Sequence, residues 1–457
     1  MVRDLTKGAP TGVIASFAAT MLLSSMMSYV YNFTDSLMVG WYVSPEALGA
    51  VSAVSGLSMV LNNLSTTIVS SFPILAGRLF GAGEHRQLKK MMANATYLSV
   101  IIVAAITAIS LLILRPMVEW MNTPPELVDM SVTYMSIIIL AKPLGAPSWL
   151  LGGMCRAFGD TKTPLYVSLI NGFGNVVFNF LFLVVFPMGI AGAALGTLCS
   201  AFTGSIIYLF VFKKRMQLIH FGREDASPST SMSRRLLALG LPIGIESAIT
   251  SVGSMILQVA INGNGTDAVT GIAVGGKILS FFWIFFSVFE SALLNFCSQN
   301  IGAKEYARVK RGIRSTLFIF LGIGAAFALL ALTGIDRFVY MAFVGDSESM
   351  LEISHNYYLT QIIFFPFIAM LFTWRAGLKA FGSTVPTLLC GVAELAARLL
   401  VSFFFADNLF MLFFAGPMAW VFSSVLVAIL YPITEKKELG GGFSTQRRRR
   451  ERKAVKE

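Results

Sequence analysis

Four polar side chains stand inside long apolar runs in the first half of the chain, and together they could bind a proton or a cation. They are the carboxylate of Asp35, the amides of Asn175 and Asn179, and the hydroxyl of Thr197. A charge at bilayer depth costs roughly 2.5–3.5 kcal/mol on insertion scales, so a bound cation or hydrogen-bond partners must offset it. The carboxylate can hold a proton, and an oxygen shell of this kind suits a hard cation such as Na⁺. Tyr31 lies four residues before Asp35 on the same helix face, which makes it a candidate for the substrate pathway.

These side chains are predicted to lie at similar depth. Asp35 lies six residues before Trp41, whose ring suits the outer interface. At 1.5 Å per residue, that spacing places Asp35 about 9 Å below the outer face. Asn179 lies eight residues before Pro187 and Thr197 lies eight residues after Gly189, which places each about 12 Å down. The spacing favours one ion site, with the alternative that the amides and the hydroxyl only join neighbouring helices.

The second half carries a different set of charges inside apolar runs. Glu394 and Arg398 are spaced i, i+4 in the favoured order and are expected to pair. Lys277 and Glu290 are thirteen residues apart, about 20 Å along a helix axis, and cannot pair with each other. Glu246 lies early in its helix. Glu246, Lys277 and Glu290 therefore either have structural partners elsewhere or face the substrate pathway.

The elements that must position these groups are transmembrane helices. The 457 residues are 55% hydrophobic and 13% charged, against about 25% charged in soluble domains, and the mean hydropathy is +0.72. Apolar runs of about 20 residues recur from end to end, which predicts an all-α polytopic membrane protein. Twelve spans are expected, at 10–41, 47–76, 94–114, 129–155, 164–187, 190–212, 237–262, 267–299, 315–335, 351–377, 385–406 and 409–432.

The loops between these spans alternate in charge. Loops on the side of the N-terminus, together with both termini, carry 30 of the 35 Lys and Arg residues, whereas the opposite loops carry two. Lys and Arg are retained on the cytoplasmic side, so both termini are expected to be cytoplasmic. The net charge of +11 is thus a topology signal and no indication of nucleic-acid binding.

The two halves of the chain repeat each other. The matched segments are GRLFGAGEHRQLKK at 77–90 with SQNIGAKEYARVKR at 298–311, RAFGDTKTP at 156–164 with KAFGSTVP at 379–386, and GAPTGV at 8–13 with GLPIGI at 240–245. Each half holds an even number of helices, so the repeats are parallel, an organisation in which transporters bind substrate between halves. Gly159 and Gly382 are predicted to end helices with positive φ.

Twelve helices in two parallel halves, with a Gly-Ala-Gly/Lys loop after helix 2 and an Ala-Phe-Gly-x-Thr loop after helix 4, resemble the multidrug and toxic compound extrusion (MATE) family over about residues 8–432. The resemblance looks closest to the bacterial DinF-like branch. It implies a V-shaped pair of bundles around a central cavity. In that branch a helix-1 Asp, an Asn-x-x-x-Asp on helix 5 and a helix-6 Thr form the cation site. Asp35, Asn175 and Thr197 match this set, and Asn179 replaces its second Asp, which leaves one carboxylate.

The resemblance implies a secondary antiporter of a bacterial inner membrane that exports amphipathic, often cationic, small molecules in exchange for H⁺ or Na⁺. Na⁺ would be held at Asp35, Asn175, Asn179 and Thr197. The protein is expected to be a monomer in the lipid bilayer, without a cofactor or a nucleic-acid partner. Its expected parts are an N-terminal six-helix bundle at 1–212, a cytoplasmic linker at 213–236, a C-terminal six-helix bundle at 237–432 and a basic cytoplasmic tail at 433–457.

The alternative function is a lipid-linked saccharide flippase of the same superfamily. Its anionic pyrophosphate carriers would suit a strongly basic cavity. The spans contain three basic residues (Lys142, Lys277, Arg398) and four acidic ones (Asp35, Glu246, Glu290, Glu394), which argues mildly against it. Lys142 stands beside Pro143, and Pro143 and Pro147 would bend that helix and free carbonyls that Lys142 could bond. An enzyme is disfavoured because no His-Glu-x-x-His, Cys-His pair or serine nucleophile motif is present, and the Cys and His residues lack metal-ligand spacing.

Overall fold

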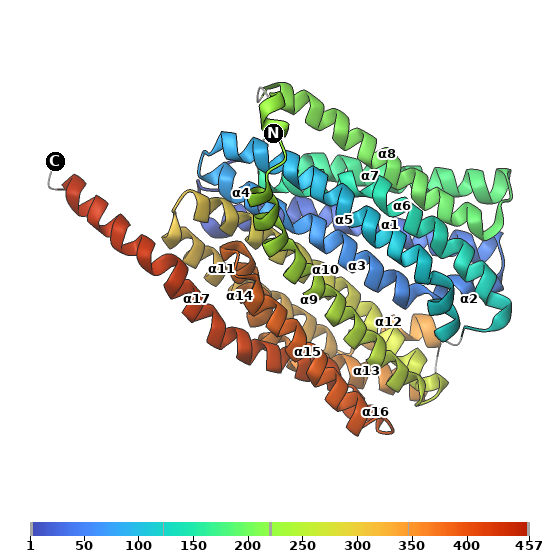
Figure 1. The fold of residues 1–457 in the computed structure, drawn as a ribbon. Coiled ribbons are helices and arrows are strands. Elements are labelled where there is room, and N and C mark those ends of the chain that lie inside the picture. Colours follow the sequence, from blue (N-terminus) through green and yellow to red (C-terminus); the bar gives the residue numbers. More distant parts are fainter. Residues whose placement is uncertain (1–2, 122, 219–221, 346, 455–457) are drawn as a thin grey trace. The chain divides into compact units, whose positions relative to one another are not determined.

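The computed structural model describes residues 3–454 except 122, 219–221 and 346. Inside helices, the side chains of residues 32, 33, 35, 36, 40, 41, 45, 46, 48, 52, 215–218, 223 and 439–454 also lie outside the description. The elements formed by the described residues are all helices (Figure 1). Eleven of these described helices are long and apolar enough to cross a membrane, and up to twelve spans result if one bent pair counts as a span. The prediction of an all-α polytopic membrane protein is therefore confirmed.

The helices form two compact units whose boundaries fall within α1 and α9. The first unit comprises Met1–Asp4 and Ala19–Gly244, and the second comprises Leu5–Ala18 and Ile245–Glu457. The elements up to the second boundary are α1 (Pro10–Tyr42), α2 (Pro45–Ala53), α3 (Ser55–Ser71), α4 (Pro73–Gly81), α5 (His85–Trp120), α6 (Pro125–Ala157), α7 (Lys162–Phe180), the π-helix η1 (Leu181–Val185), α8 (Gly189–Leu218), the 3-10 helix η2 (Arg223–Ala226) and α9 (Thr230–Asn262).

The remaining elements belong to the second unit. They are α10 (Thr266–Gly302), α11 (Tyr306–Leu332), α12 (Ile335–Val344), α13 (Glu348–Ile363), α14 (Phe365–Phe381), α15 (Thr384–Phe404), α16 (Leu409–Leu412) and α17 (Ala415–Ala454). Within this unit α10 packs against α11, α13 and α14, and α17 packs against α14 and α15. Stacked rings fill its core: the ring centroids of Phe282 and Phe365 are 3.7 Å apart, and those of Phe286 and Phe320 are 4.2 Å apart.

The first unit is built around α6, which packs against α5 and α8, while α7 packs against α8. Its core includes Phe72, Met91, Met154 and Leu236, which are fully buried. Leu236 belongs to the first turns of α9, so these turns are part of the first unit's core.

Polar contacts tie the beginnings of α1 and α9 to their units. The backbone N–H of Ser229 donates to Oδ1 of Asn94 at 2.8 Å within the first unit. In the second unit the hydroxyls of Thr11 and Ser315 lie 2.8 Å apart. Asn94 and Ser315 each lie four residues past the matched segments 77–90 and 298–311, so the two repeats use equivalent positions for these contacts.

Two predicted spans are interrupted in the structure. The span expected at 47–76 consists of α2, α3 and α4, and α4 begins at Pro73, whose ring and missing N–H prevent the preceding helix from continuing. The span expected at 351–377 consists of α13 and α14, which are bent by 51° at a break before Pro366. Both predicted spans are thus present, and each is divided where a proline stands at the beginning of a new helix.

The repeat extends to the backbone conformation of the matched loops. Gly159 and Gly382 have φ of 80° and 71°, as predicted. Gly83 has φ of 71°, and its matched residue Lys304 has φ of 59°, the one positive φ outside glycine among the described residues. A Cβ on Gly159 would overlap the carbonyl oxygen of Arg3. The matched turns therefore keep a positive φ even where Lys304 replaces glycine.

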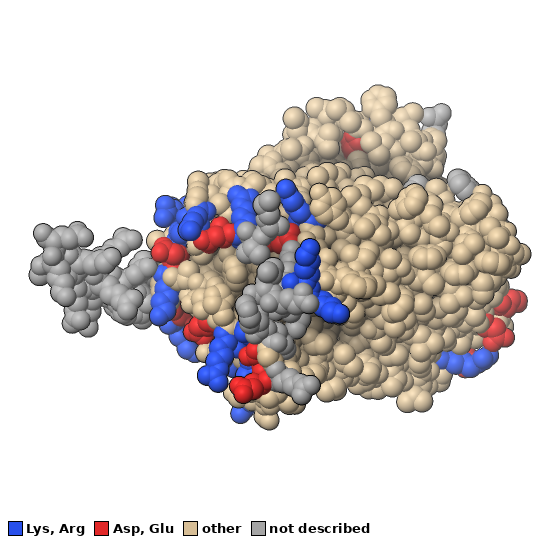
Figure 2. All heavy atoms as spheres, turned by 90° about the horizontal axis from the view of Figure 1, so that it is seen from above, with Lys and Arg blue, Asp and Glu red and all other residues tan. Residues whose placement is uncertain are grey.

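Charged side chains are concentrated at the helix ends. Figure 2 shows Lys and Arg gathered at one end of the helices, beside a broad surface without charges. At the end of α5, Arg115 pairs with Glu119 at 3.1 Å and with Asp129 at 2.7 Å. Near the other end of α5, Lys89 lies 3.6 Å from Asp225. A charge-poor band between such ends is the surface that a lipid bilayer requires.

Candidate functional site

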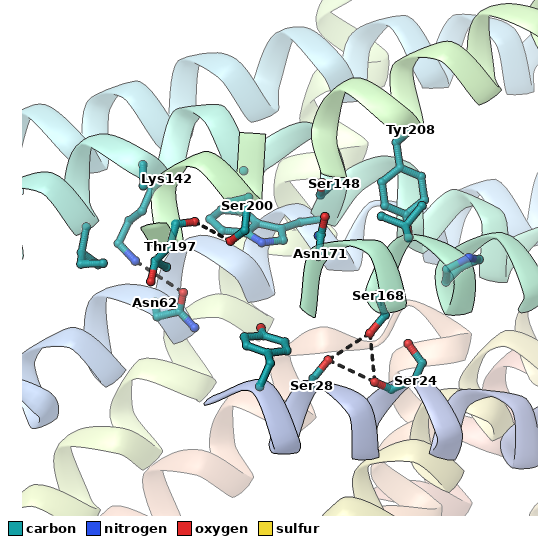
Figure 3. Close-up of a pocket in the computed structure, with 18 of the residues that line it drawn as sticks. Ser24, Ser28, Asn62, Lys142, Ser148, Ser168, Asn171, Thr197, Ser200 and Tyr208 are labelled. Carbon is teal, nitrogen blue, oxygen red and sulfur yellow. Dashed lines mark hydrogen bonds between the residues drawn. The ribbon is translucent and has the colours of Figure 1, made fainter. Parts of the chain in front are cut away.

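The first unit contains a polar cavity of about 350 Å³, lined by α1, α3, α6, α7 and α8 (Figure 3). Its walls carry many hydroxyl groups. The hydroxyl of Ser28 lies 3.3 Å from that of Ser168, and the hydroxyl of Ser168 donates to the carbonyl of Ser24 at 3.1 Å. These contacts join α1 to α7. The cavity thus combines polar groups with the rings of Tyr31 and Trp149.

Two of the predicted coupling and pathway residues line this cavity. Tyr31 projects from α1, where Gly172 on α7 leaves room for its ring: a Cβ there would lie 3.4 Å from Tyr31 Cδ1. Thr197 projects from α8, and its carbonyl accepts a hydrogen bond from the hydroxyl of Ser200 at 2.9 Å (Figure 3). The structure therefore brings these two residues, far apart in the sequence, to one site.

Asn175 and Asn179 lie beside the cavity, buried between helices. Their side chains are 1% and 0% exposed, and Nδ2 of Asn179 donates to Oδ1 of Asn175 at 3.3 Å. A Cβ on Gly196 would overlap Oδ1 of Asn179, so the missing side chain at Gly196 lets α8 pack directly on the amide. Gly196 precedes Thr197, which places the amide pair next to the cavity wall. Asp35 belongs to α1, but its side chain lies outside the described residues.

A second set of polar groups is buried in the second unit, and Arg375 on α14 lies at its centre. Nη1 of Arg375 is 3.0 Å from Oε1 of Glu246 and 3.2 Å from Oε1 of Glu394. Its Nε lies 3.9 Å from Oε1 of Glu290, and its guanidinium lies 4.7 Å from the ring centroid of Phe372. One buried cation thus joins carboxylates from three other helices, α9, α10 and α15.

Two further cations complete this ion cluster. Lys379 Nζ lies 3.3 Å from Glu290 Oε1, and Arg398 Nη2 lies 3.9 Å from Glu394 Oε2. Arg398 also donates to the carbonyl of Thr250 at 3.0 Å. The cluster consists of Glu246, Glu290, Glu394, Arg375, Lys379 and Arg398. Three acids face three bases, so the cluster is balanced, and the predicted pairing of Glu394 with Arg398 is confirmed.

Sequence reasoning missed Arg375 and Lys379 as partners. Arg375, at the end of the span expected at 351–377, and Lys379, just beyond it, were counted among the basic residues of a cytoplasmic loop. Instead, α14 continues to Phe381 and buries Arg375 to 8% exposure. The available signal was the presence of Glu246 and Glu290 in apolar runs without a counterion. Lys277, by contrast, is exposed on α10. It forms no ion pair within the part of the chain that the structure describes.

Lys142 does not satisfy the carbonyl that Pro143 frees. That carbonyl belongs to Ile139, and it accepts a hydrogen bond from the Thr107 hydroxyl at 3.5 Å. Nζ instead points into the cavity of the first unit, where its nearest hydrogen-bond partner is Oδ1 of Asn62 at 3.5 Å (Figure 3).

Apolar membrane-spanning helices that enclose a polar cavity define an integral membrane protein of the transporter class. The sequence model of the MatE family matches residues 20–181 and 242–404, once in each half of the chain. The chain therefore belongs to the MatE family, and it is a membrane transporter and not an enzyme. The match favours an extruder over the saccharide flippase considered above.

Known relatives cover most of the chain. YoeA of Bacillus subtilis, named as a probable multidrug resistance protein, is 24% identical over 74% of this chain and 74% of its own length. YpnP of the same organism, named in the same way, is 25% identical over 84% and 86%. The crystal structure of a MATE protein in its bent conformation superimposes with a TM-score of 0.85 at 18% identity, covering 95% of this chain and 98% of the other. The structural likeness shows that the fold is shared.

Proposed function

We propose that this protein exports small amphipathic compounds across a bacterial inner membrane in exchange for H⁺ or Na⁺. Membership of the MatE family and two relatives named for multidrug resistance support export. The observation that carries the proposal is the convergence of α1, α7 and α8 on one polar cavity, with Tyr31 and Thr197 in its wall and Asn179 against α8. A cavity so lined can hold both an ion and a polar part of a substrate.

The coupling site that we propose consists of Asp35, Asn175, Asn179 and Thr197. A buried pair of amides next to a cavity hydroxyl supplies oxygen atoms for a cation, and Asp35 would supply the single negative charge or accept the proton. One charge that moves down 100 mV supplies about 2.3 kcal/mol, enough for roughly a forty- to fifty-fold concentration ratio. The same residues are our ground for placing the chain in the DinF-like branch.

Other parts of the proposal concern topology and the second unit. Both termini would be cytoplasmic, because the basic loops and termini lie on one side. The chain would act as a monomer.

In the second unit, the residues proposed to lie near the substrate pathway are Glu246, Glu290 and Lys277. Because Glu246 and Glu290 belong to the balanced ion cluster, their carboxylates would hold helices together there and would not attract a cationic substrate.

The test is gradient-driven efflux from liposomes that contain the purified protein. A cationic dye (ethidium) and an anionic dye (1-pyrenesulfonate) would be loaded separately, and an imposed pH gradient and an imposed Na⁺ gradient would be applied in turn. At least one gradient should drive efflux of at least one dye. Asp35→Asn should abolish that coupled efflux, whereas Asp129→Asn, which changes an exposed carboxylate of the same unit, should leave it unchanged.

Two results would contradict the proposal. Efflux that ignores both gradients would remove the antiport function. Near wild-type coupled efflux in a folded Asp35→Asn variant would remove the coupling site from the first unit.

A further inference from the structure

The cavity of the first unit is lined by two cationic side chains, Lys142 and Arg156, and by no Asp or Glu among the described residues. Lys142 is 5% exposed, and its ammonium has only the amide oxygen of Asn62, at 3.5 Å, as a partner in the described part of the chain. No described carboxylate pairs with this buried ammonium, so an anion that enters the cavity would be stabilised by the charge already present.

Arg156 is also available to a ligand. It lies in the last turn of α6, half-buried, and forms no ion pair or hydrogen bond with other described residues. The neighbouring carboxylate of Asp160 is already used: it accepts hydrogen bonds from the backbone N–H groups of Lys162 and Thr163, each at 3.1 Å, and from the Thr163 hydroxyl at 2.6 Å. These bonds begin α7, and no ion pair joins Asp160 to Arg156 among the described residues.

Two aromatic side chains, Trp149 and Tyr31, line the same cavity as Lys142. Gly145 is one helical turn from Lys142, and a Cβ at Gly145 would lie 3.5 Å from Cζ2 of Trp149. The indole therefore lies along α6 beside Gly145, and Tyr31 also lines this cavity. A flat apolar body could stack there while an acidic group reaches Nζ of Lys142. The volume of about 350 Å³ accommodates a small fused-ring compound.

We propose that this cavity binds an amphipathic organic anion whose carboxylate, sulfonate or phosphate pairs with Lys142 and whose apolar body lies against Trp149. Arg156 would receive a second acidic group or a polar tail. The inference rests on the transport function proposed above and names its substrate class. It replaces, for this cavity, the cationic compounds that the family resemblance implies.

The test is binding of two matched probes to the purified protein in phosphatidylcholine nanodiscs. The probes are 1-pyrenesulfonate and (1-pyrenylmethyl)trimethylammonium, and energy transfer from tryptophan reports binding. The wild type should bind the sulfonate more tightly. Lys142→Met should weaken sulfonate binding by about tenfold or more, the loss expected for a charged hydrogen bond. Lys142→Arg should retain it, and Lys213→Met, which removes an exposed cation of the same unit, should have no effect.

Tighter binding of the trimethylammonium probe by the wild type, or unchanged sulfonate binding in folded Lys142→Met, would overturn the proposal. Because no gradient is applied, this result is independent of coupling. Gradient-driven ethidium efflux without sulfonate binding would leave the transport function standing and remove the anionic substrate class. Sulfonate binding without gradient-driven efflux of either dye would leave the anion site standing and remove the antiport function.

Competition separates two sources of the anion. Displacement of the sulfonate by short-chain phosphatidylglycerol, and not by 1-naphthoate, would identify a lipid headgroup as the ligand. The opposite order would identify soluble organic acids. Both outcomes support an anion site at Lys142, and displacement by neither would contradict it.

Discussion

Removal of Arg375 should destabilise the second unit strongly. Its side chain is 10% exposed, and its Nη1 lies 3.0 and 3.2 Å from the carboxylates of Glu246 and Glu394, each 5% exposed. Arg375→Met keeps the volume of the aliphatic stem but leaves three acids facing two bases in the ion cluster. Because breaking a buried ion pair leaves an uncompensated charge, we expect a loss of about 3–5 kcal/mol in the free energy of unfolding.

The assay is unfolding by sodium dodecyl sulfate titrated into bicelles, followed by tryptophan fluorescence and circular dichroism. The double variant Arg375→Met/Glu246→Gln restores the balance, with two acids and two bases. It should therefore lie within about 2 kcal/mol of the wild type, because the second substitution removes the charge that the first one stranded.

Two outcomes would refute this reasoning. A loss below about 1 kcal/mol in Arg375→Met would mean that the buried acids do not depend on the guanidinium for neutralisation. A double variant as unstable as the sum of the two single variants would mean that Arg375 and Glu246 do not interact.

Two further predictions concern glycines. Gly159→Ala and Gly382→Ala should each lower the free energy of unfolding by about 1–2 kcal/mol, because both positions have positive φ. The loss, measured by thermal unfolding, should be larger at Gly159, where the new Cβ also overlaps a carbonyl oxygen. Wild-type stability in either variant would contradict the equivalence of the two helix ends. Gly196→Ala should displace the Asn179 amide, cost about 1–3 kcal/mol and slow coupled efflux. The control Gly322→Ala places no atom within 4 Å of its new Cβ and should leave both stability and efflux unchanged. Wild-type efflux in Gly196→Ala would show that the tight contact between Gly196 and Asn179 is dispensable.

Several features followed from local sequence. Long apolar runs predicted membrane-spanning helices, since a bilayer tolerates only segments that satisfy their own backbone. Gly159 and Gly382 predicted positive φ, because each stands where a helix ends before the next begins. The pairing of Glu394 with Arg398 followed from i, i+4 spacing, which brings two side chains together on any helix.

The candidate site was only partly accessible in this way. The predicted depths in the bilayer grouped Thr197 with Asn179, and the close approach of Asn179 to Gly196, the residue before Thr197, agrees with this grouping. Their role in ion binding stays a prediction. The same arithmetic could not predict that Lys142 faces Asn62, because proximity across helices depends on how each helix is rotated about its axis.

The sequence by itself determined that this is a helical membrane transporter made of two repeats, because composition, periodicity and loop motifs act over neighbouring residues. Only the tertiary structure decided which charges neutralise one another. Arg375 has its partners on three other helices, α9, α10 and α15, and nothing local distinguishes it from a loop cation. The tertiary structure also left Lys142 in a cavity without a described acid. Buried charges are fixed by whichever helices pack around them, and that packing is a non-local property of the folded chain.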